Sequence, residues 1–197
     1  VGSILTSGSI IEWFRKTFGI SDFEKLSKIY NNKKPTNILF FPQFEFSHSP
    51  VNAIKTKGII LGIDRSTNIS DIYMSILKYL TFDTKNALNF ISKKTNIKIK
   101  KIICSGGSVK NDDWMKLRSN ILNYDLFIDK NVENVSLGSA ILAGLGANIY
   151  KNERDAFRKI KNKFKIIINN KIKKEDVTLF NKYNSNIKKI LEINNIL

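Results

Sequence analysis

Apolar runs alternate along the chain with segments of helical spacing. Residues 1–8 (VGSILTSG) predict a strand that runs into a glycine, and residues 9–18 continue with apolar side chains at helical spacing. Ser21 and Glu24 have the spacing of a capping box, so we expect a second helix over residues 22–32.

The middle of the chain predicts two short strands and one long helix. Residues 37–44 (NILFFPQF) indicate a buried strand broken by Pro42, and residues 58–63 (GIILGI) indicate another. A long amphipathic helix then begins at Ser70, which is a candidate N-cap. Its apolar stripe consists of Ile72, Ile76, Leu77, Leu80, Leu88 and Ile91.

The second half continues the alternation of strands and helices. Strands are expected over residues 99–104 (IKKIIC) and 124–128 (YDLFI), and helices over residues 111–122 and 136–150. The basic tail predicts further helices, the last over residues 175–193. Strands that alternate with helices indicate an α/β domain with a largely parallel central sheet.

Two adjacent glycines, Gly106 and Gly107, stand where the strand ending at Cys104 passes into a helix. Glycine adopts positive φ without steric cost and lets another group approach the backbone. A strand, a glycine pair and a helix start together expose backbone N–H groups, as an anion or nucleotide site requires. A plain tight turn needs the same glycines, so this stretch alone leaves both interpretations open.

Length and composition describe a folded protein. With 197 residues, of which 42% are hydrophobic, the chain can bury one good-sized core or two small ones. Its apolar runs are too short to span a bilayer, and no secretory signal is visible, so we expect no membrane partner. The chain begins with Val1 rather than Met, which we interpret as a sign of a longer protein.

The chain has one cysteine and one histidine. A single cysteine excludes an internal disulfide, which fits a cytoplasmic protein, and the pair is too small for a Cys/His zinc site. Cys104 is expected to be a small buried strand residue rather than a reactive thiol. His48 is expected to lie in a loop, because no Ser-His-Asp spacing supports a catalytic base. We therefore expect no metal site.

The formal net charge of +16 favours a polyanionic partner, and nucleic acid is the obvious candidate. The lysines, however, are spread over almost every predicted helix, without a single stripe or an arginine-rich arm. The accompanying excess of Ile and Asn indicates a compositional drift in which Lys fills solvated positions. This distribution argues against functional nucleic-acid binding.

The order of these elements and the residues within them resemble the C-terminal domain of the FGGY carbohydrate kinases, in the actin-like ATPase superfamily. Residues 58–63 and, seven residues later, 71–77 (DIYMSIL) match the family's second signature, although Lys78 replaces its final acidic or amide residue. SGGSVKNDDWMKLRSNIL, residues 105–122, is similar to the family's adenosine-binding loop and helix. Further similar segments are residues 8–19, 134–150 and 180–191.

The resemblance implies a fold and a domain organisation. The fold would be a ribonuclease H-like, actin-like ATPase domain with a mixed, largely parallel sheet flanked by helices, whose first strands precede Val1. Residues 1–197 would form the C-terminal nucleotide-binding domain, with the sugar-binding N-terminal domain outside this chain. The strand at residues 1–7 would then have an exposed edge that invites pairing with another chain, as in a homodimer.

The resemblance also assigns candidate nucleotide-binding residues. Gly107 would let the adenine or ribose lie against bare backbone, and Gly8 maps onto a family glycine near the phosphates. Asn111 offers a donor and an acceptor suited to a purine edge, although a helix N-cap is the alternative and the two roles can coexist. The predicted nucleotide-binding residues are Gly8, Gly106, Gly107, Ser108 and Asn111.

No segment of the chain resembles the family's catalytic base, so we expect no catalytic residue here. LGIDRST, residues 61–67, resembles the phosphate-binding hairpin of actin-like ATPases, but Arg65 and Ser66 occupy the place of its glycine turn. Asp64 is therefore expected to be a loop residue rather than a magnesium organiser.

Two hypotheses remain. In the first, the chain is the nucleotide-binding half of an ATP-dependent sugar kinase, which uses ATP and Mg²⁺ and is inactive when isolated. Trp114, which pentulose, hexulose and aldonate kinases tend to show, favours a xylulokinase-like enzyme. In the second, the chain is a catalytically inactive kinase-derived binding module or a basic nucleic-acid-binding domain. Steep salt dependence on nucleic-acid columns would favour the nucleic-acid-binding alternative.

Overall fold

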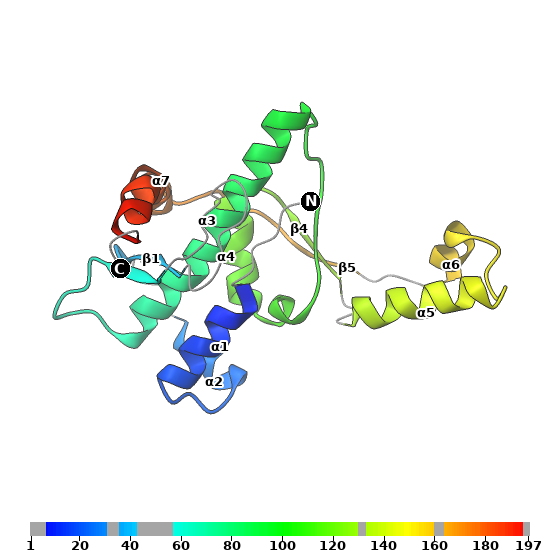
Figure 1. Ribbon diagram of the computed structural model, residues 1–197, viewed down its shortest axis with the longest axis horizontal. Helices are drawn as coiled ribbons and strands as arrows, with labels where there is room; N and C mark the ends of the chain where they lie inside the picture. The colour runs from blue at the N-terminus through cyan, green and yellow to red at the C-terminus, as the bar shows by residue number, and fades with distance from the viewer. Residues whose placement is uncertain (1–6, 31–35, 43–56, 130–132, 160–163, 195–197) are drawn as a thin grey trace. The chain divides into compact units, whose positions relative to one another are not determined.

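The computed structural model describes residues 7–30, 36–42, 57–129, 133–159 and 164–194 (Figure 1). The chain divides into two compact units. The first unit comprises the described residues of 1–99, 120–123 and 170–197, and the second those of 100–119 and 124–169. The strand predicted at residues 1–7 and the loop with His48 lie outside the described residues, except for Ser7.

The first unit consists of helices and a two-stranded antiparallel ribbon, in which Leu39 pairs with Leu61. Its elements are α1 (Ser7–Thr17), α2 (Phe23–Ile29), β1 (Leu39–Phe41), β2 (Ile59–Leu61), α3 (Ile69–Thr95) and α7 (Lys174–Asn194).

Helix α3 is the central element of the first unit. Helices α1 and α2 and strand β1 pack against it (Figure 1). All ten residues from Tyr73 to Phe82 are buried, so this part of the helix is enclosed on every side. The predicted apolar stripe is therefore only part of a fully covered surface. Towards the C-terminal end of α3, Leu88 is half-buried and Ile91 is exposed.

A buried ion pair joins α3 to α7. Lys78 Nζ lies 2.7 Å from Asp176 Oδ1, and the two residues are 5% and 4% exposed. Aromatic rings also join α7 to α3 and β1, since the centroid of the Tyr183 ring lies 5.0 Å from that of Phe41 and 5.7 Å from that of Tyr79. Removing either charge would leave the other buried and uncompensated.

The start of α2 differs from its prediction. Asp22, rather than Ser21, is the N-cap, and its Oδ1 accepts a hydrogen bond from the Lys25 backbone N–H at 2.7 Å. The Ser21 hydroxyl donates instead to the other Asp22 carboxylate oxygen, so it is not the capping acceptor. The predicted capping box of Ser21 and Glu24 is therefore wrong.

The start of α3 differs in the same way. Asn68, two residues before the predicted Ser70, is the N-cap and accepts from the backbone N–H groups of Ser70 and Asp71. The Asp71 carboxylate accepts in return from the Asn68 N–H at 3.0 Å. This reciprocal pair is a complete capping box, which a single hydroxyl at Ser70 would not supply.

The second unit contains a three-stranded sheet in the order β3-β4-β5. Strands β3 and β4 are parallel, and β5 is antiparallel to β4. Its elements are β3 (Ile102–Cys104), the 3₁₀ helix η1 (Gly107–Lys110), α4 (Asp112–Leu122), β4 (Leu126–Asp129), α5 (Asn134–Gly146), α6 (Glu153–Lys159) and β5 (Phe164–Ile167). The last residues of α4 belong to the first unit.

Strand β5 is absent from the sequence prediction, which assigned the basic tail to helices. The apolar residues of FKII are surrounded by lysines, so local periodicity alone does not distinguish the strand. Pairing with β4, as in the Leu126–Ile167 pair, supplies the strand geometry. The described pairings are mixed, as predicted, but one is parallel and two are antiparallel, so parallel pairs do not predominate.

Helices α5 and α6 pack against each other (Figure 1), and a tight contact lies in the turn between them. A Cβ atom on Gly144 would lie 2.5 Å from Cε2 and 2.8 Å from Cδ2 of Tyr150. The Gly144 carbonyl also accepts from the Ile149 N–H at 2.8 Å, and Lys159 Nζ lies 5.3 Å from the Tyr150 ring centroid.

Within the described ranges, every helix is too short or too polar to cross a bilayer.

We expect Gly144→Ala to lower the free energy of unfolding by about 1–3 kcal/mol, because the new methyl group displaces the Tyr150 ring. Gly138→Ala is the matched control, since a Cβ atom on Gly138 of the same helix meets nothing within 4 Å. The control should gain up to about 1 kcal/mol from helix propensity. Urea denaturation measures both, and equal stabilisation by the two substitutions would contradict the Gly144 contact.

A second prediction concerns pH. Burial raises the pKa of Asp83 on α3 to about 6, against a smaller lowering effect of a hydrogen bond with Tyr79. An Asp carboxyl group in an unfolded chain has a pKa of about 3.9, so the protonated Asp83 carboxyl group contributes its full stability to the fold only below that pH. This contribution is lost as the pH rises through about 6. The stability advantage of Asp83→Asn over wild type should therefore grow by up to about 2 kcal/mol between pH 4.5 and 7.5.

Urea titrations at the two pH values measure this difference. Glu192→Gln on α7, at an exposed position, controls for the removal of a surface carboxylate. A difference that does not change with pH would show that Asp83 ionises as it does in the unfolded chain.

Candidate functional site

The glycine pair lies at the carboxyl end of a strand in the second unit. Strand β3 ends at Cys104, the chain turns through Ser105 and Gly106, and η1 leads directly into α4. Because β3 and β4 are parallel, their carboxyl ends lie at the same edge of the sheet. Ligands of open α/β sheets bind outside this edge, so the loop has the position that the sequence predicted for a site.

Gly106 is required by the backbone conformation. Its φ of 86° and ψ of −176° belong to a region that side chains other than glycine rarely adopt. Its carbonyl accepts from the Val109 N–H at 3.2 Å, and the Val109 side chain is buried. Gly106 is therefore needed for the turn. Of the two interpretations that the sequence left open for the glycine pair, the tight turn applies to this residue.

Gly107 has a different environment. It begins η1 without positive φ, it is exposed, and a Cβ atom at this position would meet nothing within 4 Å. Gly8, the second residue of α1, is also exposed, and a Cβ atom there would likewise meet nothing within 4 Å. Neither backbone strain nor packing within the described residues explains glycine at these two positions.

Asn111 caps helix α4. Its Oδ1 accepts from the Trp114 backbone N–H at 2.9 Å, and its own backbone N–H donates to the Ser108 carbonyl at 3.2 Å. The N-cap role that the sequence left open is therefore present. Since Oδ1 serves the helix, a contact between Asn111 and a purine would use the Nδ2 amide as donor.

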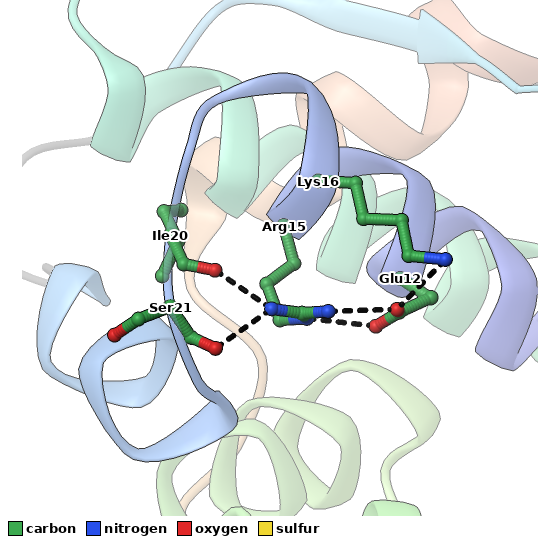
Figure 2. Close-up of polar contacts among 5 residues, drawn as sticks. All are labelled: Glu12, Arg15, Lys16, Ile20 and Ser21. Carbon is green, nitrogen blue, oxygen red and sulfur yellow. Dashed lines mark hydrogen bonds and ion pairs between the residues drawn. The ribbon is translucent and has the colours of Figure 1, made fainter.

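Helix α1, which carries Gly8, is fixed at its other end by Arg15 (Figure 2). The guanidinium donates to both Glu12 carboxylate oxygens at 2.8 Å and to the carbonyls of Ile20 and Ser21, also at 2.8 Å. Hydrogen bonding from Arg15 is the main cause that lowers the pKa of Glu12 to about 2. The carboxylate one turn after Gly8 is thus ionised and paired.

The cluster of Glu12, Arg15 and Lys16 was not predicted from the sequence. Its signal was present in the sequence, because an acidic residue followed by basic residues at i+3 and i+4 on a helix predicts ion pairs. The bonds from Arg15 to the two loop carbonyls depend on the turn after α1 and have no comparable sequence signal.

Asp64 lies in a loop, as predicted. Its Oδ1 accepts from the backbone N–H of Ser66 at 2.8 Å and from the Ser66 hydroxyl at 2.7 Å. These hydrogen bonds lower the pKa of Asp64, and the bond from the Ser66 hydroxyl has the largest effect. The carboxylate therefore closes its own turn between β2 and α3, where a phosphate-binding hairpin would continue into a second strand.

The remaining chemically notable residues belong to the interior. Cys104 is buried, and burial raises the pKa of its thiol, which fits the predicted structural role. Trp114 is 3% exposed and belongs to the core. Among the described residues, no group of three or more His, Cys, Asp and Glu side chains could hold a metal ion.

The structure brings four of the five predicted site residues together. Gly106, Gly107, Ser108 and Asn111 lie in one loop of the second unit, whereas Gly8 belongs to the first unit. That Gly8 lies near the phosphates, and that these residues bind a nucleotide, stay predictions.

Comparison with known proteins supplies the family. Residues 1–147 match the C-terminal domain of the FGGY family of carbohydrate kinases. The chain belongs to this family. Its sequence relatives include the glycerol kinase of Mycoplasma genitalium, which is 30% identical over 186 residues, 92% of this FGGY chain and 37% of that protein. Glycerol kinase 2 of Sulfolobus acidocaldarius is 31% identical over 167 residues, 84% of this chain and 33% of that protein.

Solved structures agree on the fold. The crystal structure of Plasmodium falciparum glycerol kinase with ADP matches with a TM-score of 0.78 and 24% identity, over 94% of this FGGY chain and 37% of that chain. A xylulose kinase from Rhodospirillum rubrum matches with a TM-score of 0.72 and 13% identity, over 94% and 38% of the two chains. The predicted actin-like ATPase fold is thereby confirmed.

The FGGY chain spans about a third of the length of these relatives. The expectation of xylulokinase-like specificity is not confirmed, because the curated relatives named above are glycerol kinases.

The different roles of the two glycines give a test of the loop. Gly106→Ala should lower the free energy of unfolding by about 1–3 kcal/mol, because alanine is strained at this backbone conformation. Gly107→Ala should change it by less than about 0.5 kcal/mol, because the position is unstrained and open. Urea denaturation of the two variants measures this, and equal losses would contradict the backbone geometry described here.

Proposed function

We propose that this chain is the nucleotide-binding half of an ATP-dependent kinase that phosphorylates a hydroxyl group of a polyol or sugar. Membership of the FGGY family supplies the reaction class. The observation that carries the nucleotide site is Gly107, an exposed glycine at the sheet edge for which the described residues supply no steric or backbone reason.

The loop geometry suits a nucleotide. A base or ribose would lie against the backbone at Gly107, where a larger side chain would occupy its space. The Asn111 Nδ2 amide would donate to an acceptor on the purine edge, while Oδ1 holds the first turn of α4. Gly8, at the start of α1, would admit the phosphates in the same manner. ADP in the similar Plasmodium falciparum glycerol kinase supports this choice of ligand.

In the reaction, this chain binds and orients the nucleotide and contributes no acid or base. MgATP, when bound, would supply the phosphoryl group, and its metal ion would provide charge neutralisation at the phosphates. The described residues contain no cluster of three acidic or other ligating groups, so Mg²⁺ would be held mainly by the phosphates and by residues elsewhere in the whole protein. The acceptor and the catalytic aspartate would come from an N-terminal lobe. The isolated chain would then be inactive.

Two observations bear on the acceptor. Relatives of 30% and 31% identity are glycerol kinases, which favours glycerol. Trp114 was the reason to expect a xylulokinase-like enzyme, but its burial gives it a structural role that does not depend on the acceptor. We therefore rank glycerol first and xylulose second. The proposed setting is the cytoplasm.

The experiment is steady-state kinetics of the whole protein. Gly107→Val should raise the KM for ATP at least severalfold and leave the KM for the acceptor nearly unchanged, because the valine side chain blocks approach to the backbone. Asn111→Ser keeps a capping oxygen but removes the amide donor, so it should cost about 1–2 kcal/mol in ATP affinity. Gly138→Ala, on α5 outside the loop, is the control.

Assays with glycerol and xylulose in parallel identify the acceptor. Unchanged ATP kinetics in both loop variants would remove the glycine loop from the site. Absence of ATP-dependent phosphorylation of any polyol or sugar would favour the alternative of a catalytically inactive binding module.

A further inference from the structure

Strand β5 brings a lysine to the edge of the sheet that carries the glycine loop. In the sheet register, Cys104 of β3 pairs with Ile128 of β4, and Ile128 pairs with Lys165 of β5. Cys104 is the last residue before the loop, so Lys165 belongs to the cross-strand row that ends at the loop. Side chains of one row share a face of the sheet, here the face of the buried residues Cys104 and Ile128.

On this face Lys165 meets the start of helix α4. Its Nζ forms an ion pair with Oδ2 of Asp112, the first residue of the helix and the neighbour of Asn111 in the chain. The two side chains are 45% and 53% exposed, so the pair contributes little to folding stability. It is nevertheless the contact that places a positive charge from β5 at the candidate loop.

Asp112 creates an electrostatic problem for the proposed ligand. A carboxylate at the first turn of a helix is favoured by the helix dipole, which explains its place in the fold. The same carboxylate, one residue from Asn111, would add negative charge beside a loop that is proposed to bind an anionic nucleotide. Loss of the compensating positive charge would weaken the binding of the anionic nucleotide roughly three- to tenfold.

We propose that Lys165 is a positioning residue of the nucleotide loop, which holds the Asp112 carboxylate at the start of α4 and neutralises its charge beside the bound nucleotide. This inference rests on the proposed function. Residues 164–167 lie beyond the segment that matches the family, residues 1–147, so the family match does not assign this role. Lys165 acts through Asp112 and does not itself contact the nucleotide.

A second ion pair on the same helix provides a matched control. Lys116 Nζ lies 3.1 Å from Asp113 Oδ1, and these side chains are similarly exposed. Both partners belong to α4, so loss of Lys116 removes the same unit charge as loss of Lys165 but releases Asp113 instead of Asp112. A general effect of the basic surface would appear equally in variants of Lys116 and Lys165.

The test is ADP binding to the whole protein, measured by calorimetry at low and high salt. Lys165→Gln should weaken ADP binding roughly three- to tenfold at low salt, and the loss should shrink as salt screens the exposed carboxylate. Lys165→Arg should keep wild-type affinity, and Lys116→Gln should leave it unchanged. The double variant Lys165→Gln with Asp112→Asn should recover wild-type affinity, because the unpaired carboxylate is gone.

The double variant is the decisive measurement. If it remains as weak as Lys165→Gln alone, Lys165 contacts the ligand or supports the fold directly, and the inference is wrong. Equal losses in Lys165→Gln and Lys116→Gln would also overturn it. Gly107→Val is measured alongside: if it weakens ADP binding and Lys165→Gln does not, the inference fails and the proposed function stands. If neither weakens binding, both fail.

Discussion

The buried ion pair of Lys78 and Asp176 is the interaction on which the first unit depends. Helix α3 is covered on all sides over its middle turns, and one of the covered residues is a lysine. A buried ammonium group is tolerated only with a partner of opposite charge, and Asp176 of α7 is that partner. Helix α7 must therefore dock on α3 before the charge of Lys78 in the core of this unit is compensated.

This ion pair also accounts for a departure from the family pattern. The FGGY signature is expected to end with an acidic or amide residue at the position of Lys78. Here the basic residue stands on α3 and the acidic residue on α7, so these two buried charges compensate each other. The departure is explained by local compensation within one unit and does not by itself argue for loss of kinase function.

Local patterns in the sequence predicted most of the helices and the strands β1 to β4. The amphipathic spacing of α1, the glycine-rich loop before α4 and the long periodic segment of α7 are all local signals. Strand β5 and the partner of Lys78 were not predictable in this way, because both depend on residues distant in the chain. The helix caps at Asp22 and Asn68 were misplaced by one or two residues, since neighbouring polar side chains compete for the same backbone N–H groups.

For the candidate site, the sequence located the loop but could not separate its two glycines. Gly106 is explained by positive φ, and Gly107 is not, a distinction that exists only in the backbone dihedral angles. Asn111 was correctly identified as a residue at the start of a helix, and its side-chain acceptor is the cap. Lys165 had no sequence signal, because its relation to Asp112 follows from the register of an unpredicted strand.

The two tryptophans of the chain are divided between the two units. Trp13 stacks on Phe40 in the first unit, with 6.2 Å between ring centroids, and Trp114 lies buried in the second, where its backbone N–H is held by Asn111. Each unit therefore contains its own intrinsic fluorophore. In a variant that retains one tryptophan, the fluorescence emission reports on the unfolding of a single unit. Comparison of the two such variants therefore shows which unit unfolds first, without an added dye.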